Sequence, residues 1–519
     1  MSGFSLNAER RERELAESTD GRIVDLLVVG LGVTGAGVAL DAASRGLSIV
    51  AVDAHDLAFG TSRWSSKLVH GGLRYLAKAQ FGVAYESAVE RGILMTTTAP
   101  HLVHPLPMLL PLTPMVSPAQ GLMTRAGFVA GDILRASAHT SRSVLPRPRT
   151  LSTTETLRMA RGIRRQDLRG GLLSWDGQLE DDARLVIGLA RTAAAYGARV
   201  LTRCRVQELH GDGAVIRDEI TGSTSTIKAR AVINATGVWA GGLVPGIDLR
   251  PSRGTHIVLR AETLQNPSVA LMAPVPGANN RYVFALPQPD GLVYAGLTDE
   301  PVDGDIPDVP QPSAGEIGFL LDVLSGVLEN PVRHEDIAGA YAGLRPLLNH
   351  DGKTADVSRA HAVLTSPEGV VTVVGGKLTT YRRMAEDAVD TVLRQQGMQP
   401  APCVTRTLPL VGAGDTSTLV GQGIPYRLIR RYGAEAALLS HDPELLRPIS
   451  DDIPATMAEL LWGVEHEGAL DVDDLLDRRT RIGLVPADRE VAVPFAERAL
   501  ALQTREAGSV DLPGQSIGE

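Results

Sequence analysis

A glycine-rich segment near the start of the chain has the spacing that lets a backbone approach a phosphate. Residues 30–35 are Gly-Leu-Gly-Val-Thr-Gly, and an acid, Asp53, follows. Gly30 permits a tight turn, Gly32 lets the backbone approach a pyrophosphate, and Gly35 lets a helix sit close to a strand. Asp53 can accept hydrogen bonds from both hydroxyls of a ribose and disfavours the extra phosphate of NADP. The pattern predicts a dinucleotide site without distinguishing FAD from NAD.

The elements around these glycines are the ones that such a site requires. Residues 23–29 form an apolar run broken only by an aspartate, which predicts a strand buried on both faces. A helix is expected over residues 36–45 and a second strand over residues 48–52. The start of that helix would offer N–H donors and a positive partial charge to the pyrophosphate.

Two further segments could complete the site. Hydroxyl side chains beside a lysine can donate to phosphates and to a flavin edge, although a solvated loop has the same composition; they are Thr61, Ser62, Ser65, Ser66 and Lys67. Strands are expected over residues 199–206, with Val206 as the backbone contact to adenine, and over residues 231–236.

A second glycine turn lies much later in the chain. Residues 375–380, Gly-Gly-Lys-Leu-Thr-Thr, follow an apolar strand at 370–374 and are expected to open a helix that runs to Asp390. A flavin above that helix start would have its N1/O2 edge facing unpaired N–H groups. Reduction places negative charge at that edge, so the helix start should raise the flavin potential.

Several sequence blocks occur together in an order typical of one enzyme family. They are residues 60–76, 175–176, 181–186, 232–239, 253–258, 341–347, 375–382, 466–469 and 478–480. Through them the chain resembles the FAD-dependent (aerobic, respiratory) glycerol-3-phosphate dehydrogenases over nearly its whole length. The resemblance implies an α/β fold, with a Rossmann-like FAD-binding domain, an antiparallel-sheet cap or substrate domain and a C-terminal helical domain.

Domain boundaries follow from this comparison and from composition. We expect disordered tails at 1–21 and 508–519, and a C-terminal helical domain at 403–507. The FAD-binding domain is expected to be discontinuous, over 22–80, 150–245 and 355–398, and the cap over 81–149 and 246–354. Asp181 or Asp182 is expected to cap a helix that runs to residue 196.

The resemblance also assigns residues to FAD and to the substrate. The expected FAD contacts are Gly30, Gly32, Gly35, Asp53, Thr61, Ser62, Ser65, Ser66, Lys67, Leu68, His70, Val206, Gly376, Lys377, Leu378 and Thr379. Arg359 and Arg74, with Tyr75, would bind the substrate phosphate, because a guanidinium fork matches phosphate oxygens. Arg345 would hold the C1 and C2 oxygens, and Lys377 would lie between flavin and substrate.

The reaction that the resemblance implies is oxidation of sn-glycerol 3-phosphate to dihydroxyacetone phosphate. A hydride would move from C2 to flavin N5 while His256 or His70 takes the hydroxyl proton, and a membrane quinone would receive the electrons. Three alternatives stay open: an oxidase that uses oxygen, an amino-acid oxidase of the same fold, and a non-catalytic nucleotide-binding module.

Composition and charge exclude other classes of protein. A net charge of −9 and an aromatic content of 4% argue against nucleic-acid binding. We expect no metal, because His101 and His104 lie among prolines and His466 lacks ligand spacing.

The family implies a cytoplasmic protein, peripheral on the inner face of the cell membrane, and is compatible with a homodimer. Membrane contact could come from Arg427, Arg430 and Arg431 or from the apolar, proline-rich stretch 92–124.

Overall fold

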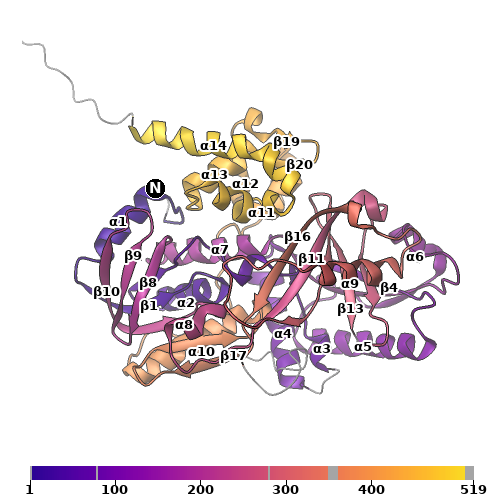
Figure 1. Cartoon of the computed structure of the whole chain (residues 1–519), viewed down its shortest axis with the longest axis horizontal. Helices are drawn as coiled ribbons and strands as arrows, with labels where there is room; N and C mark the ends of the chain where they lie inside the picture. Colours follow the sequence, from indigo (N-terminus) through magenta and orange to yellow (C-terminus); the bar gives the residue numbers. More distant parts are fainter. Residues whose placement is uncertain (1–2, 77–79, 279–280, 349–360, 509–519) are drawn as a thin grey trace, which may run out of the picture.

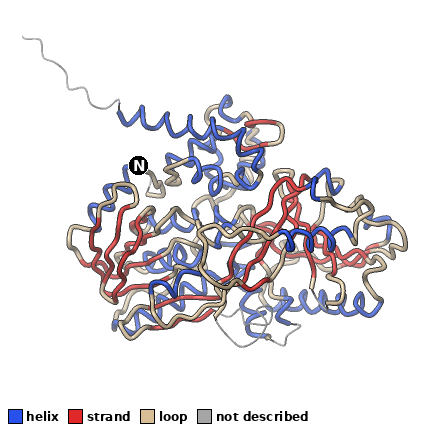
Figure 2. Tube along the Cα trace, viewed as in Figure 1, coloured by secondary structure: helices blue, strands red, loops and turns tan. Residues whose placement is uncertain are grey.

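The computed structural model describes residues 3–76, 80–278, 281–348 and 361–508. Two sheets stand side by side, each with helices on it, and a C-terminal cluster of helices lies over both (Figure 1). Figure 2 shows that the strands fall into these two groups and that the C-terminal part is almost wholly helical. The α/β fold class expected from the sequence is confirmed.

The first sheet has eight strands, ordered β17-β18-β10-β1-β2-β7 with the β8–β9 hairpin attached to β10. β10, β1, β2, β7 and β18 run parallel, and α2 (Val33–Ser44), α7 (Asp182–Ala195) and α10 (Tyr381–Gln396) cover one face. The strands are β1 (Ile23–Val29), β2 (Ile49–Val52), β7 (Arg199–Leu201), β8 (Cys204–His210), β9 (Gly213–Asp218), β10 (Thr224–Asn234), β17 (His361–Thr365) and β18 (Val371–Gly375). Both faces of β1 are apolar because both are buried. The helices cover one face, and residues of the β8–β9 hairpin pack against the other.

The second sheet has ten strands, ordered β15-β11-β14-β13-β12-β4-β6-β3, with β16 on β11 and β5 on β6. Nearly all its pairs are antiparallel. The strands are β3 (Leu68–Val69), β4 (Val103–Pro111), β5 (Arg149–Leu151), β6 (Gly171–Leu179), β11 (Ser252–Arg260), β12 (Ala270–Pro274), β13 (Tyr282–Pro287), β14 (Leu292–Gly296), β15 (Glu300–Pro301) and β16 (Ile337–Arg345).

The two faces of this sheet carry different helices. α9 (Ala314–Ser325) packs on one face through Leu320 and Leu324, together with alternate strand residues. α5 (Pro118–Ser137) packs on the other through Phe128. Two more helices, α3 (Leu73–Leu76) and α4 (Phe81–Ile93), contact α5 on that side. Alternation of apolar side chains along each strand therefore gives two separate layers of core.

Sheet membership corrects the expected domain boundaries. Residues 149–151 and 171–179 were expected largely in the FAD-binding domain, but they form β5 and β6 of the second sheet. β6 pairs with β4 over its whole length, from Val103 opposite Leu179 to Pro111 opposite Gly171. The strand expected over 199–206 is likewise broken into β7 and β8, and Arg203 has a left-handed φ of 57° between them. The pairing of β4 with β6 joins residues that lie far apart in the chain.

The N-terminal segment is helical, so the expected disordered tail at 1–21 is wrong for residues 8–18. α1 (Ala8–Ser18) begins at Asn7, whose side chain accepts a hydrogen bond from the Arg10 N–H. Arg11 is buried, pairs with Asp218 and donates to the Thr202 carbonyl at 2.8 Å. Some charged residues of this segment face solvent, whereas Arg11 and Glu14 are buried where the helix packs on the first sheet.

The C-terminal helical domain lies against α7 and β16 (Figure 1). It contains α11 (Tyr426–Tyr432), α12 (Ala436–Leu439), α13 (Met457–His466), α14 (Pro486–Gly508) and the hairpin β19 (Pro448–Ser450) and β20 (Ile453–Thr456). Of the tail expected at 508–519, residues 509–519 lie outside the described residues. Across the described ranges, no helix combines the length and apolar character needed to span a bilayer.

Candidate active site

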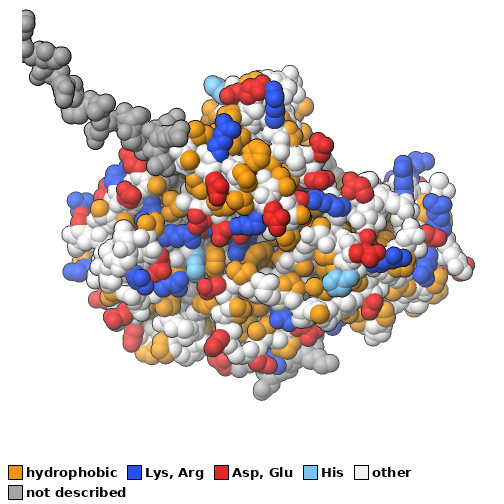
Figure 3. All heavy atoms as spheres, turned by 45° about the horizontal axis from the view of Figure 1, so that its top comes forward, with side chains coloured by type: hydrophobic (Ala, Val, Ile, Leu, Met, Phe, Trp, Pro, Cys, Tyr) orange, Lys and Arg blue, Asp and Glu red, His pale blue; other side chains and the backbone are white. Residues whose placement is uncertain are grey.

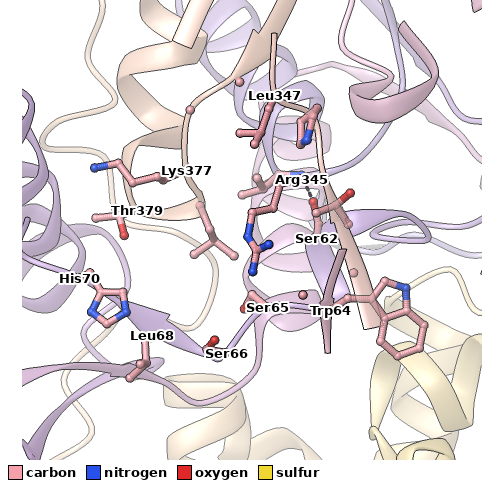
Figure 4. A pocket seen from close by; sticks show the side chains of 18 of the residues that line it. Ser62, Trp64, Ser65, Ser66, Leu68, His70, Arg345, Leu347, Lys377 and Thr379 are labelled. Atoms are coloured by element: carbon pink, nitrogen blue, oxygen red, sulfur yellow. Dashed lines mark hydrogen bonds between the residues drawn. The ribbon is translucent and has the colours of Figure 1, made fainter. Parts of the chain in front are cut away.

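One large cavity of about 1950 Å³ lies between the two sheets. Its lining begins at Gly30, Asp53 and Val206 on the first sheet and reaches His256 and Arg345 on the second. An elongated cavity of this extent can hold a dinucleotide together with a small substrate. Figure 4 shows side chains that line it, among them Arg345 of the second sheet and Lys377 and Thr379 from the segment that follows β18.

Glycines shape the end of the cavity at β1. Gly30 has a φ of 96°, a left-handed conformation that favours glycine. A Cβ on Gly35 would lie 1.7 Å from the Gly30 carbonyl oxygen, so only glycine lets α2 approach the turn. The Asp53 carboxylate accepts from the N–H groups of Leu31 at 2.6 Å and His55 at 2.8 Å. Burial raises the pKa of Asp53 to about 6, so the group is still mainly ionised at neutral pH.

A second helix start meets the cavity near its middle. β18 ends at Gly375, and Gly376 follows it, with φ values of 75° and 71°. The short helix η7 (Leu378–Thr380) then leads into α10. Neither α2 nor α10 has an acid in its first turn or a side chain that caps it in the described structure. Both helix starts therefore present positive partial charge to this region.

His256 lies on β11, where it lines the cavity with only 1% of its surface exposed. Its Nε2 is 2.8 Å from the Ser66 hydroxyl, and its ring stacks on Tyr341 with centroids 4.7 Å apart. Burial, and then the positive charges of Lys67 and Arg345, lower the pKa of His256 well below its usual 6.5. The imidazole is therefore neutral at neutral pH and able to accept a proton.

Arg345 ends β16 opposite Ser252 of β11, so it shares the cavity with His256. Its guanidinium donates to the Ser252 hydroxyl at 3.2 Å, to Asp299 at 3.3 Å and to the Thr298 carbonyl at 3.2 Å. A Cβ on Gly254 would lie 2.2 Å from an Arg345 nitrogen. Glycine at that position thus leaves the space that the guanidinium occupies.

Three more of the expected residues also line the cavity: Lys377, Tyr75 and His70. The Lys377 ammonium donates to the Ser87 hydroxyl and lies 4.2 Å from the centre of the Tyr75 ring. Figure 4 shows this side chain directed away from Arg345. His70 Nδ1 is 2.9 Å from Asp176, so the Asp176 carboxylate fixes the orientation of the imidazole.

Most of the residues predicted from the sequence come together here. Those that line the cavity are Gly30, Gly32, Asp53, Thr61, Ser62, Ser65, Ser66, Leu68, His70, Tyr75, Val206, His256, Arg345, Gly376, Lys377, Leu378 and Thr379. Arg359 lies outside the described residues, and Arg74 is placed only as part of α3. Their proposed roles stay predictions.

Lys67, which the sequence predicts as an FAD contact, has a fully buried side chain that does not line the cavity. It pairs with Asp182 at 2.8 Å and donates to the Arg63 carbonyl at 2.7 Å. Asp182 also accepts from the Ser65 N–H at 2.9 Å, so this pair holds the hydroxyl-rich loop on the start of α7. The expected helix cap there is Asp181, as the structure confirms.

Sequence reasoning missed several residues of the site. Trp64 and Trp239 line the cavity, and Ser87 and Asp176 orient the side chains described above. Asp176 stands in one of the family-like blocks and could have been assigned a role, whereas nothing in the sequence marks Ser87. Within the described residues, no group of three or more His, Cys, Asp or Glu side chains could hold a metal ion.

Comparison with known proteins assigns the chain to a family. Residues 25–382 match the family described as FAD dependent oxidoreductase, and residues 403–508 match the C-terminal domain of alpha-glycerophosphate oxidase. The chain is 53% identical over 508 residues to glycerol-3-phosphate dehydrogenase 1 of Mycobacterium tuberculosis, covering 96% of this chain and 98% of that protein. The chain belongs to the FAD-dependent glycerol-3-phosphate dehydrogenases.

Other members and structural neighbours agree. A mitochondrial glycerol-3-phosphate dehydrogenase of Arabidopsis thaliana is 34% identical, over 92% of this chain and 82% of its own. The solved glycerol-3-phosphate dehydrogenase of Bacillus halodurans, complexed with FAD, has a TM-score of 0.72 and 28% identity, covering 99% of this chain and all of that one. The L-alpha-glycerophosphate oxidase of Mycoplasma pneumoniae, at 16% identity and a TM-score of 0.56 over 75% of this chain and 99% of its own, shares the fold.

The cavity of this dehydrogenase fits FAD, the cofactor of the family. Gly30, Gly32 and Asp53 form a turn and an acid suited to the adenosine and pyrophosphate half, with Val206 beside them. Gly376 and Leu378, at the other helix start, line the part of the cavity next to Arg345 where the ring would lie. A Cβ on Gly32 would lie 3.0 Å from the Ser62 hydroxyl, so a side chain there would crowd the turn.

Proposed function

We propose that this protein oxidises sn-glycerol 3-phosphate to dihydroxyacetone phosphate. The observation that carries the proposal is the juxtaposition of neutral His256 with Arg345 in the cavity that fits FAD. The names of its relatives, glycerol-3-phosphate dehydrogenases, supply the substrate. Bound FAD supplies the acceptor, at N5, for the hydride that leaves C2.

The protein's own residues handle the proton and the charges. His256 takes the proton of the C2 hydroxyl as the hydride leaves. Its imidazole is uncharged before the reaction and can therefore accept a proton. Arg345 donates to the C1 and C2 oxygens, where negative charge develops as the alcohol becomes a ketone. Arg74 and Arg359, with Tyr75, would bind the phosphate. Lys377, whose ammonium lies 4.2 Å from the centre of the Tyr75 ring, would lie between flavin and substrate.

Anaerobic mixing of the FAD-loaded protein with sn-glycerol 3-phosphate tests this proposal. The visible flavin absorbance should be lost in a single turnover, because no acceptor is present to reoxidise the cofactor. Glycerol and the sn-1 enantiomer serve as controls, since one lacks the phosphate and the other presents it with the wrong hand. A flavin that stays oxidised with the substrate would refute the proposal.

We also propose that a membrane quinone is the electron acceptor. Among the residues that line the cavity are apolar side chains of α5 and of the strands it packs on, Met123 and Phe128 with Met108, Met272 and Phe284. Such a lining suits a quinone ring better than a charged carrier. Hydrogen peroxide formed without added quinone, at one molecule per substrate oxidised, would instead favour an oxygen-using oxidase; rapid quinone reduction with little peroxide supports the proposal.

The exposed surface of α5 and α4 suits contact with the inner face of the cell membrane. α5 exposes Leu122 by 69% and Ile133 by 66%, and α4 exposes Phe81 by 66%. Scattered apolar residues are common on protein surfaces, but these lie on two helices in contact. The arginine cluster considered as an alternative is engaged within the protein: Arg427 pairs with Glu459, Arg430 with Glu180 and Arg431 with Asp181.

Sedimentation with lipid vesicles tests this contact. Leu122→Asp combined with Ile133→Asp should release the protein from vesicles without changing flavin reduction, because neither side chain lines the cavity. Ile220→Asp is the matched control, since Ile220 is 57% exposed on the β9–β10 turn of the first sheet. Equal binding of both variants would contradict the proposal. The homodimer remains a prediction that sedimentation velocity of the detergent-free protein checks.

A further inference from the structure

The C-terminal domain contacts the cofactor loop without reaching the cofactor cavity. None of the described residues of 403–508 lines the cavity. The loop between Asp53 and Ser62 does line it, through Asp53, His55, Phe59, Thr61 and Ser62 among others. The opposite side of this loop faces the C-terminal domain. The domain also contacts α7 and the second sheet, where Leu484 and Val485 pack with Tyr294 and Tyr341.

The main contact is made by one buried carboxylate. Asp56 is wholly buried and accepts from Arg478 Nε at 2.6 Å and from Arg479 at 2.5 and 2.9 Å. Both arginines belong to the C-terminal helix η11 (Asp474–Arg479) and are at most 2% exposed. Burial alone would raise the pKa of Asp56, but the charges of Arg479 and Arg478 hold it well below its usual range. The carboxylate is therefore ionised, and its partners are fixed by three hydrogen bonds.

A second contact lies a few residues further along the loop. Arg63 donates to the Phe59 carbonyl at 2.9 Å and to Asp477 of η11 at 3.3 Å. Its guanidinium carbon lies 4.1 Å from the centre of the Trp64 ring. Since Phe59 and Trp64 line the cavity, Arg63 links side chains of the cofactor site to the C-terminal domain.

The loop between these contacts has a conformation that needs support. Ala58 has a φ of 59°, in the left-handed region that costs a non-glycine residue free energy. Its N–H donates to the Leu31 carbonyl of the glycine-rich turn at 3.0 Å. The loop thus connects the turn that would face the pyrophosphate with Asp56, and displacement of one would displace the other.

From this geometry we infer that η11 of the C-terminal domain sets how tightly FAD is held, with Asp56, Arg478 and Arg479 as positioning residues for the 53–62 loop. None of the three lines the cavity. They fix the loop on which Asp53 and the hydroxyl residues stand, so their loss lets the loop move and FAD leave. Figure 3 shows a band of acidic and basic side chains where this domain meets the rest of the molecule, in keeping with a contact made largely of ion pairs.

The experiment compares two isosteric substitutions in the FAD-loaded full-length protein. Asp56→Asn removes the charge from the loop contact. Glu435→Gln removes the charge from a different ion pair between the C-terminal domain and the rest of the protein. In that pair Arg191 of α7 donates to Glu435 at 2.7 and 2.8 Å, and neither residue lies on the 53–62 loop. FAD release is followed by the gain of flavin fluorescence after dilution, and global unfolding by circular dichroism. Both substitutions should lower the unfolding midpoint, because each breaks a pair that is largely buried.

The rate of FAD release separates a positioning role from general stability. We expect Asp56→Asn to release FAD about ten-fold faster or more, and Glu435→Gln to stay within about two-fold of the unaltered protein, both measured equally far below their own midpoints. Should Asp56→Asn yield no folded protein, Arg479→Lys replaces it, since it keeps the charge but loses the fork and should give an intermediate rate. Equal release rates for the loop variant and Glu435→Gln would overturn the inference.

Discussion

Replacing His256 tests the proposed proton transfer most directly. The structure gives the imidazole two contacts with separate roles, a hydrogen bond to Ser66 and a ring stack on Tyr341. The imidazole is buried, its Nε2 is 2.8 Å from the Ser66 hydroxyl, and its ring stacks on Tyr341. His256→Ala removes the base and both contacts. Ser66→Ala keeps the base but removes the hydroxyl that orients it. Comparing the two variants separates loss of the proton acceptor from loss of its alignment.

The magnitude follows from these contacts. A positioned general base contributes roughly 100- to 10,000-fold, which corresponds to about 3–5 kcal/mol in the barrier. His256→Ala should therefore lower kcat/KM by that factor, whereas loss of one hydrogen bond in Ser66→Ala should cost about 1 kcal/mol, or some five-fold. Loss of the ring stack on Tyr341 should reduce stability by a further 1 kcal/mol or so. Stability and catalysis thus change by different amounts in the two variants.

The assay is the rate of anaerobic flavin reduction as a function of pH. Because the pKa of His256 lies well below 6.5, the unaltered protein should show no loss of kcat/KM near pH 6.5 and should lose activity only at lower pH, as the imidazole gains a proton. In His256→Ala this acidic limb should vanish, and added imidazole should restore part of the rate. An unchanged limb, or kcat/KM within about three-fold of the original, would refute the assignment of His256 as the base.

Three other predictions follow from the same contacts. Gly35→Ala should abolish FAD retention, because its Cβ would lie 1.7 Å from a backbone oxygen, while Gly188→Ala on α7, with nothing within 4 Å, should stabilise by about 0.5–1 kcal/mol; thermal unfolding and bound-flavin content check both. Arg345→Lys should raise the KM for glycerol 3-phosphate more than ten-fold, since a single ammonium cannot replace the fork, and an unchanged KM in steady-state assays would exclude substrate contact. Burial lowers the pKa of His101 to about 3 and of His104 to about 4. The unfolded chain therefore binds more protons below pH 6.5, and stability should be complete above that pH and fall towards pH 4 by up to about 1.4 kcal/mol per unit for each histidine; a flat unfolding midpoint would contradict this.

Local features of the site were predictable from the sequence. The strand expected over residues 23–29 is Ile23–Val29, and the glycine turn and α2 follow it as predicted. The antiparallel strands expected in the cap are also present, as β13 and β14. In each case the deciding interactions join residues close together in the chain, such as the contact between Gly35 and the Gly30 carbonyl. Apolar periodicity and glycine spacing record such interactions directly.

The sequence alone therefore determined the cofactor-binding strand, glycine-rich turn and helix near the N-terminus, the order of the elements and the family. Only the tertiary structure decided which charged side chain meets which partner. Lys67 pairs with Asp182 and does not line the cavity, and Asp56 meets Arg479 from a position 423 residues away. The physical reason is that a charge is satisfied by any opposite charge brought near it, so residue type does not specify the partner. Long-range packing of the C-terminal domain on the cofactor loop makes that choice.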